Sequence, residues 1–332
     1  MGSTRFRAWR VHKHNGAIEA KLETISEHDM GEGTVTIQAE YSSLNYKDAL
    51  ALTGKGKIMH RFPLIAGIDV AGRVADSDDP RFSSGDPVLV TGCGLGENTD
   101  GGFAEYVRVA AEHVIPIPKG LDPRSAMQLG TAGFTVGLAL QRLEHNGLRA
   151  GCGSIAVTGA SGGVGALAVA ILAQCGYHVV ALTSDARVYD WLKDLGATEV
   201  LDSREPGFGE RALESARYAG AIDTVGGEVL ARLLPVIDWW GGVAVIGNAG
   251  GDEFTATVYP FILRGISLLG VNSVATPRPL REMVWRRLAN ELRPQKLDAI
   301  AAHEIVLADV MDAAEAMIDG HGPRGRTLVR IR

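Results

Sequence analysis

The sequence predicts an α/β protein with a doubly wound parallel sheet in one domain and a partly closed, β-barrel-like arrangement in a second. Two observations lead to this prediction. From residue 154 to about residue 247, short apolar strands alternate with helical stretches, as expected of repeated β-α-β units. From residue 6 to about residue 107, short strands follow one another with glycine and proline between them, which is typical of a barrel-like β domain.

The composition is that of an ordinary globular protein. The 332 residues are 46% hydrophobic and 22% charged, with a net charge of −6 and no strong basic patch, so neither nucleic acid nor an anionic membrane is an expected partner. The N-terminus lacks the apolar stretch of a secretory signal, and the apolar run Val164–Ala173 is too short to span a bilayer. The cysteines are few and dispersed, so we expect no disulfide framework and a cytoplasmic location.

The first domain is expected to begin with β-strands. Strands are predicted at Phe6–Val11 and Thr34–Ala39, and the polar and aromatic stretch Tyr41–Leu50 opens a short helix. Further strands follow turns rich in glycine and proline, within 62–74, 85–90 and 102–107. These short elements are the basis for the barrel-like prediction.

The stretch Ser154–Gly165 is interpreted as a buried strand, a glycine-rich turn and the start of a helix. Ala160, Gly162 and Gly165 occupy the positions of a G-x-G-x-x-G fingerprint, with alanine in place of the first glycine. Glycine lets the backbone approach a pyrophosphate, and the helix Val164–Cys175 directs its free N–H groups toward it. The alternative is a turn that binds nothing, but the flanking strands favour a dinucleotide. The predicted contacts are Ser161, Gly162, Gly163 and Val164.

The order of elements predicts that one domain is interrupted by the other. The strands of the parallel sheet are predicted at Ser154–Val157, Val179–Leu182, Val200–Leu201, Gly220–Asp223 and Val243–Ile246. After about residue 264 the pattern changes to strand Ser267–Val271, helix Leu280–Leu292, strand Ile305–Leu307, helix Asp309–Ile318 and strand Thr327–Ile331. We infer that residues 1–123 and 265–332 form one domain, and that residues 124–264 form the dinucleotide-binding domain between them.

Several motifs, in order along nearly the whole chain, resemble one family. They include Ser43–Asp48, Gly67–Asp69, Gly130–Thr135, Thr158–Gly165 and Gly325–Val329. The chain is similar to the medium-chain dehydrogenase/reductase superfamily, and within it to the zinc-independent, quinone-oxidoreductase-like group that contains the bacterial acrylyl-CoA reductases. This resemblance implies a Rossmann-type nucleotide domain, a GroES-like catalytic domain and a homodimer, for which the strand Ser267–Val271 is a suitable sheet edge.

No metal site is expected. The zinc-dependent members of the superfamily use a cysteine and a Gly-His-Glu motif, and the matching positions here are Asn45 and Gly67-Ile68-Asp69. Isoleucine binds no metal, asparagine is a poor zinc ligand, and a structural zinc site needs about four clustered Cys or His ligands. The resemblance and these residues together predict hydride transfer to an activated alkene, with hydrogen bonds in place of a Lewis acid.

The predicted nucleotide is NADPH. The turn after the second strand of the parallel sheet differs from the resembled subfamily, in which a basic residue binds the 2′-phosphate of NADP at the position of Asp185. Asp185 would repel a phosphate if it pointed inward, and we interpret it as the N-cap of the following helix. Predicted cofactor contacts at this edge of the sheet are Thr183, Ser184, Asp185, Arg187, Ser203 and Arg204.

Further cofactor contacts are predicted where strands and helices face the nicotinamide. Tyr46 lies on the loop that, by resemblance, approaches the nicotinamide. Thr131 and Thr135 stand at the start of the nucleotide domain, with helix capping as their alternative role. Ile246, Gly247, Asn272 and Ser273 follow parallel strands, whose carboxyl ends form the ligand-binding edge.

Asn45, Tyr46 and Asp48 are the predicted catalytic residues. An amide donates hydrogen bonds, and a tyrosine hydroxyl donates a hydrogen bond or a proton. For Asp48, capping of the helix is an equal alternative. The resemblance implies reduction by NADPH of the double bond of an α,β-unsaturated acyl-CoA such as acryloyl-CoA, with Tyr46 or solvent as the proton donor.

Two other functions remain open at this point. One is a quinone or enone reductase of the same family, which would share the cofactor but need no coenzyme A pocket. The other is an NADPH-binding sensor without turnover, which would need no Asn45 or Tyr46. In all three cases the expected partners are small molecules and a second copy of the chain.

Overall fold

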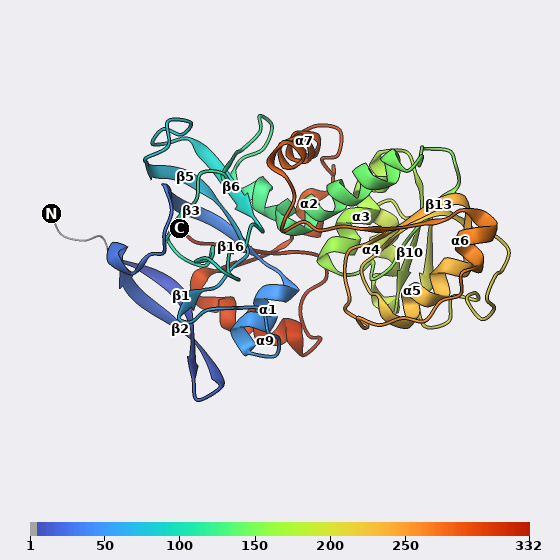
Figure 1. The fold of residues 1–332 in the computed structure, drawn as a ribbon, viewed down its shortest axis with the longest axis horizontal. Helices are drawn as coiled ribbons and strands as arrows, with labels where there is room; N and C mark the ends of the chain where they lie inside the picture. The colour runs from blue at the N-terminus through green and yellow to red at the C-terminus, as the bar shows by residue number, and fades with distance from the viewer. Residues whose placement is uncertain (1–4) are drawn as a thin grey trace. The chain divides into compact units, whose positions relative to one another are not determined.

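The computed structural model describes residues 5–332, and the chain forms two compact units. The first consists of residues 5–131, 274–289 and 301–332, and the second of residues 132–273 and 290–300. Both units are therefore discontinuous. Figure 1 shows the elements by label and the course of the chain by colour.

The first unit contains two sheets. One has three strands in the order β2-β1-β4, and the other has seven, in the order β15-β16-β3-β5-β6-β8, with β7 also paired to β3. The predicted GroES-like class is confirmed, and among the described residues the strand order does not close into a ring. Its strands are β1 (Arg5–His14), β2 (Ala17–Ser26), β3 (Val35–Leu44), β4 (Leu64–Ile65), β5 (Asp69–Ser77), β6 (Pro87–Thr91), β7 (Tyr106–Val109), β8 (Ile115–Pro116), β15 (His303–Val306) and β16 (Thr327–Arg330).

Helices of the first unit complete its core. The helix α1 (Tyr46–Thr53) packs against α9 (Val310–Ile318), which comes from the C-terminal segment. Leu52, Leu307 and Val310 are buried in the same apolar cluster as the β-strands. The remaining helical segments are η1 (Glu27–Asp29), α7 (Arg278–Ala289) and η4 (Leu307–Asp309).

The second unit is built on one parallel sheet with the strand order β11-β10-β9-β12-β13-β14. The order reverses direction about β9, which is the doubly wound, Rossmann-type arrangement predicted from the sequence. The strands are β9 (Ser154–Val157), β10 (His178–Thr183), β11 (Glu199–Asp202), β12 (Tyr218–Asp223), β13 (Ile237–Val245) and β14 (Ser267–Gly270). Its first strand has the predicted bounds, because a short apolar run buried on both faces is a strong local signal.

The helices α3, α4 and α6 of the second unit lie against strands of this sheet. The helix α3 is buried along most of its length because alanine, leucine and valine fill it. The helical segments are α2 (Pro123–His145), which crosses the boundary between the units in sequence, α3 (Gly163–Gln174), η2 (Ala186–Val188), α4 (Tyr189–Asp194), α5 (Gly227–Leu233), η3 (Leu234–Val236), α6 (Tyr259–Arg264) and α8 (Leu297–Ile300). In the part of the chain that the structure describes, no helix is long and apolar enough to cross a membrane.

The sheet of the second unit continues past residue 264, where the sequence predicts a domain boundary. Its sixth strand is β14, which pairs in parallel with β13. The domain boundaries at 123 and 264 stay a prediction, while the compact units divide at 131 and 273.

Candidate active site

The predicted catalytic residues lie where strand β3 passes into helix α1. Asn45 is the N-cap of α1, and Asp48 is the third residue of the helix. The Asp48 carboxylate accepts a hydrogen bond from the backbone N–H of Asn45 over 2.8 Å, as in a capping box. This bond satisfies an N–H group that the helix itself leaves without a partner. Asp48 therefore caps α1, which is one of the two roles predicted for it.

Asp48 is also buried, with 1% of its surface exposed. Its Oδ1 accepts a hydrogen bond of 2.8 Å from the backbone N–H of Ile68. Burial, followed by the charge of nearby Asp69, raises the pKa of Asp48 to about 7. A carboxyl group at this position is thus close to its titration midpoint at neutral pH.

Asp69 lies at the start of β5 and is fully buried. Its carboxylate accepts hydrogen bonds from the Ser43 hydroxyl at 2.6 Å, the Asn45 amide at 2.9 Å and the Thr131 hydroxyl at 2.5 Å. The backbone N–H of Thr131 donates to the same carboxylate. These donors offset the cost of removing the charge from water.

Arg326, the residue before β16, places a buried cation beside the two carboxylates. Its Nη1 donates to the Asn45 amide oxygen at 2.9 Å, and its Nη2 donates to the Ser43 hydroxyl at 2.7 Å. Nη2 lies 3.9 Å from the Asp69 carboxylate, and 4% of the Arg326 side chain is exposed. We refer to Ser43, Asn45, Asp48, Asp69, Thr131 and Arg326 as the buried polar network.

Gly130 makes room for the buried polar network. Its φ of 51° lies outside helical geometry and marks a kink in α2. A Cβ atom there would lie 2.7 Å from the Arg326 guanidinium, the Asp69 carboxylate and the Ser43 hydroxyl. Glycine is required at this kink because only glycine combines positive φ with the absence of a side chain.

The buried polar network holds one predicted catalytic residue, Asn45, by hydrogen bonds and leaves another, Tyr46, exposed. The Asn45 amide donates to Asp48 and Asp69 and accepts from Arg326, so both ends of this side chain are held within the protein. Tyr46 is different, because half of its surface (52%) is exposed. The catalytic roles of Asn45, Tyr46 and Asp48 stay predictions, with Tyr46 the most accessible of the three.

The second cluster of predicted residues surrounds the glycine-rich turn of the second unit. Gly162 is the N-cap of α3, a helix of 12 residues whose first N–H groups face the turn. A Cβ at Gly165 would lie 2.2 Å from the carbonyl oxygen of Gly159. The strand and helix therefore approach as closely as the fingerprint requires, which fits a turn built to receive a pyrophosphate.

Hydrogen bonds connect this turn to the neighbouring strand ends. The Thr158 hydroxyl donates to the buried Asp223 carboxylate at 2.6 Å and accepts from the backbone N–H of Thr224 at 2.9 Å. Burial raises the pKa of Asp223. On the other side of β9, the Thr183 hydroxyl donates to the Ser161 hydroxyl at 3.2 Å. These bonds hold the turn in register with strands β10 and β12.

The basic residues predicted to bind the 2′-phosphate are both paired with aspartates. Arg187 donates from Nε and Nη2 to Asp185 at 2.8 and 3.0 Å, and Asp185 is the N-cap of η2. Arg204 donates in the same way to Asp202 at 3.0 and 2.6 Å. Hydrogen bonds from Arg204 lower the pKa of Asp202 to about 2.

The other predicted cofactor residues occupy several environments. Thr135 is buried in α2, whereas Ser184 and Asn272 are exposed; Ser203, Ile246, Gly247 and Ser273 are half-buried. Ile246 and Gly247 follow β13, and a Cβ at Gly247 would lie 2.4 Å from the Thr224 carbonyl oxygen. Asn272 and Ser273 follow β14 at the same carboxyl edge of the sheet. Thr131, by contrast, belongs to the buried polar network of the first unit.

Sequence reasoning did not select Ser43, Asp69, Asp202 or Arg326 as site residues. Asp69 and Arg326 adjoin apolar strands, and a charged residue in such a setting signals a buried partner. Nothing in the sequence pairs the two, because they are far apart along the chain. Asp202 was detectable in principle, since Asp-x-Arg occurs at the ends of two successive predicted strands.

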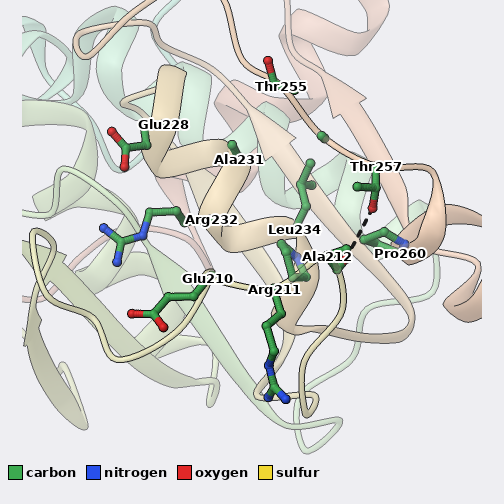
Figure 2. Close-up of a pocket in the computed structure, with 13 residues that line it drawn as sticks. Glu210, Arg211, Ala212, Glu228, Ala231, Arg232, Leu234, Thr255, Thr257 and Pro260 are labelled. Carbon is green, nitrogen blue, oxygen red and sulfur yellow. Dashed lines mark hydrogen bonds between the residues drawn. The ribbon is translucent and has the colours of Figure 1, made fainter.

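A cavity of about 590 Å³ lies beside α5 in the second unit. Figure 2 shows Glu228 and Arg232 extending from α5, and the Thr257 hydroxyl bonded to the carbonyl of Ala212. The cavity contains none of the residues predicted to bind the cofactor. A smaller hollow nearby is lined by Thr158, Ser203 and, again, Arg232.

The open GroES-like β unit and the Rossmann-type unit are the two parts of a medium-chain dehydrogenase. Residues 31–119 match the alcohol dehydrogenase GroES-like domain, and residues 163–290 match the zinc-binding dehydrogenase domain. The chain belongs to the medium-chain dehydrogenase/reductase family, in its acrylyl-CoA reductase-like group.

Individual relatives match over the whole chain. The probable acrylyl-CoA reductase AcuI of Escherichia coli K12 is 48% identical over 98% of this chain and 99% of its own length. The putative quinone oxidoreductase YhfP of Bacillus subtilis is 44% identical over 99% and 100%. The crystal structure of E. coli YhdH with bound NADPH superposes with a TM-score of 0.94, 48% identity and coverage of 98% and 100%. That of B. subtilis YhfP with NAD bound has a TM-score of 0.96, 44% identity and coverage of 99% and 100%.

The residues at the positions that match zinc ligands do not fit a zinc ion. The Asn45 amide oxygen accepts from Arg326, the Asp69 carboxylate accepts several hydrogen bonds, and Ile68 has no donor atom. Zinc prefers thiolate, imidazole and carboxylate ligands with free lone pairs. Within residues 5–332 no three His, Cys, Asp or Glu side chains are grouped to hold a metal.

Proposed function

We propose that this protein uses NADPH to reduce the carbon–carbon double bond of an α,β-unsaturated acyl-CoA such as acryloyl-CoA. The observation that supports the proposal most is the full-length likeness to a protein named a probable acrylyl-CoA reductase, at 48% identity. The buried polar network and the glycine-rich turn support it, because both are built from the motifs of that group. The proposed partners are small molecules and a second copy of the chain, and the proposed location is the cytoplasm.

The glycine-rich turn supports NADPH as the cofactor. When bound, NADPH supplies a hydride for transfer to an electron-poor carbon. Gly162, Gly163 and the N-terminus of α3 would hold its pyrophosphate, and Thr183 and Ser161 would line the turn toward the adenosine side. A crystal structure of a relative 48% identical to this chain contains bound NADPH.

The chain's own residues would bind and orient the acyl group and supply a proton. Asn45 is held by Asp48, Asp69 and Arg326, so it fixes the backbone at the start of α1. Tyr46 follows directly and keeps an exposed side chain, which suits a contact to the cofactor or a proton donor. Negative charge that develops on the thioester oxygen would be stabilised by N–H and O–H donors.

Quinone reduction is the alternative function, and the name of a second relative supports it. YhfP of B. subtilis, which is named a putative quinone oxidoreductase, is 44% identical over 99% of this chain. Both activities need the same hydride donor, and the electron-poor acceptor distinguishes them. The non-catalytic sensor has no comparable support.

The proposed function is tested by following NADPH oxidation with acryloyl-CoA and a simple quinone as parallel substrates. We expect faster turnover with acryloyl-CoA, measured as kcat/KM, and loss of at least tenfold in the Tyr46→Phe variant if its hydroxyl supplies the proton. Turnover of the quinone alone would replace the proposal with its alternative. Unchanged activity of Tyr46→Phe would leave solvent as the proton donor.

We propose that the protein is a homodimer that joins two copies along β14. This strand is one of the two edges of the six-stranded sheet, and exposed apolar side chains lie on it and on the adjoining elements. They are Trp239, Trp240, Tyr259, Ile262, Leu263 and Leu268. An apolar patch beside an open strand edge is the usual setting for pairing between copies.

Sedimentation equilibrium is expected to give twice the mass of one chain, and a Leu268→Lys variant is expected to shift the measured mass toward that of the monomer. A monomeric wild type would contradict this proposal.

A further inference from the structure

Two ion pairs of the same geometry lie side by side on the second unit. In each, a backbone N–H of the arginine and its Nε donate to one carboxylate oxygen, while Nη2 donates to the other. The first joins Asp185 and Arg187, with distances of 3.0, 2.8 and 3.0 Å. The second joins Asp202 and Arg204, with distances of 2.9, 3.0 and 2.6 Å. We call these the two Asp-x-Arg pairs.

The sheet places both Asp-x-Arg pairs beside the glycine-rich turn. Strands β10 and β11 pair in parallel with Thr183 opposite Asp202, so the two pairs follow the carboxyl ends of adjacent strands. The backbone N–H of Ala160 donates to the Leu182 carbonyl at 3.1 Å, and the Thr183 hydroxyl contacts Ser161. In dinucleotide-binding sheets this edge receives the adenosine ribose, where an acidic residue favours NAD and a basic residue favours NADP.

Each aspartate balances the charge of the arginine that it holds. Arg187 and Arg204 are 89% and 66% exposed, while their aspartates are 31% and 34% exposed. Bidentate pairing occupies one edge of the guanidinium and brings a negative charge to the same place. A phosphate dianion that approaches either arginine is therefore attracted less than it would be by an unpaired one.

We propose that Asp185 and Asp202 are specificity-determining residues. They pair with Arg187 and Arg204 and thereby reduce the factor by which the protein binds NADPH more tightly than NADH. This inference rests on the proposed function, since it concerns how the same edge distinguishes the two nucleotides. Without the aspartates, both guanidiniums would be available for the 2′-phosphate of NADPH, a group that NADH lacks. The relevant quantity is the ratio of the dissociation constants for NADH and NADPH.

The chain contains a matched control. Asp79 and Arg81, in the turn after β5, form a third pair with the same contacts, at 2.9, 2.9 and 2.8 Å. This pair belongs to the first unit, away in sequence from the strands of the parallel sheet. An Asp79→Asn variant removes the same charge from the same local geometry without altering the ends of β10 and β11.

The test is a fluorescence titration of the whole protein with NADPH and with NADH, which requires no turnover. The variants are Asp185→Asn, Asp202→Asn, the double variant and Asp79→Asn. We expect the NADH-to-NADPH ratio of dissociation constants to rise about threefold in each single variant and about tenfold in the double variant, as for partly exposed charges. This increase in the ratio is expected to become smaller as the salt concentration is raised, because salt screens exposed charges. In Asp79→Asn the ratio is expected to stay within twofold of the wild type.

Two results would overturn the inference, and they are distinguishable. If the wild type binds NADPH but the double variant leaves the ratio unchanged or lowers it, the aspartates do not set the preference and the proposed function stands. If the wild type binds neither nucleotide, both the proposed function and this inference are wrong. Unfolding curves of the variants show whether any change in affinity arises from lost structure.

Discussion

Replacing Arg326 with methionine is expected to lower the free energy of unfolding by about 3–5 kcal/mol, the usual cost of removing one partner of a buried ion pair. Arg326 is the cation of the buried polar network and lies beside Asp69, and the side chains of Asp48 and Asp69 are both buried. Without it, the Asn45 amide oxygen loses its donor and the Asp69 charge loses its nearest cation. Chemical denaturation monitored by circular dichroism measures the change.

The control for this prediction is Arg330→Met, at the end of β16, the strand that begins directly after Arg326. Arg330 contacts Glu304 at 3.5 Å with half of its side chain exposed, so its removal is expected to cost less than about 1 kcal/mol. Arg326→Lys keeps the charge but loses the second hydrogen bond, and an intermediate loss is expected. If Arg326→Met stayed within 1 kcal/mol of the wild type, the buried polar network would not hold the start of α1 as described.

The second large effect is expected at the glycine-rich turn. Gly165→Val should raise the dissociation constant of NADPH at least about 100-fold, which corresponds to a loss of about 2.7 kcal/mol of binding free energy. A Cβ at Gly165 would lie 2.2 Å from the Gly159 carbonyl oxygen and 2.7 Å from the Ala160 Cα. Both neighbours are backbone atoms, so the turn or α3 has to move. Movement of either displaces the N–H groups that would contact the pyrophosphate.

Gly270→Ala serves as the comparison for the glycine prediction. A Cβ at Gly270 meets no atom within 4 Å, so this change is expected to leave NADPH affinity within about twofold. Both variants are titrated with NADPH by fluorescence, and thermal unfolding is recorded in parallel. NADPH affinity of Gly165→Val equal to that of the wild type would mean that the turn does not bind the pyrophosphate.

Local sequence signals located the first five strands of the parallel sheet, but they did not show that β14 belongs to it. The strand β9 has the predicted bounds, and the helix α3 begins and ends one residue before the predicted limits, because apolar runs and glycine turns mark both. The strand β2 was not predicted. It pairs along its whole length with β1, but most of its residues are exposed or half-exposed, so it lacks a buried apolar face that a pattern could reveal.

The site was predictable in its motifs but not in its pairings. The motif around Asn45 indicated where α1 begins, and the fingerprint located the turn. Asp69 and Arg326 come together only because β5 and the residue before β16 both lie next to β3. Contacts of this kind follow from sheet topology, which no local pattern contains. The pairing of Arg187 with Asp185 is local, and it places a carboxylate against a basic residue that is predicted to contact the cofactor.

Hydride transfer from NADPH to the β-carbon of an unsaturated acyl-CoA can be followed with an isotope label. The reaction of acryloyl-CoA with NADPH that carries deuterium in place of both hydrogens at C4 of the nicotinamide is analysed by mass spectrometry and NMR, which locate the label in the product. We expect one deuterium at the β-carbon of propionyl-CoA and a solvent-derived hydrogen at the α-carbon. Unlabelled propionyl-CoA, or recovery of unchanged acryloyl-CoA alongside intact NADPH, would contradict this expectation.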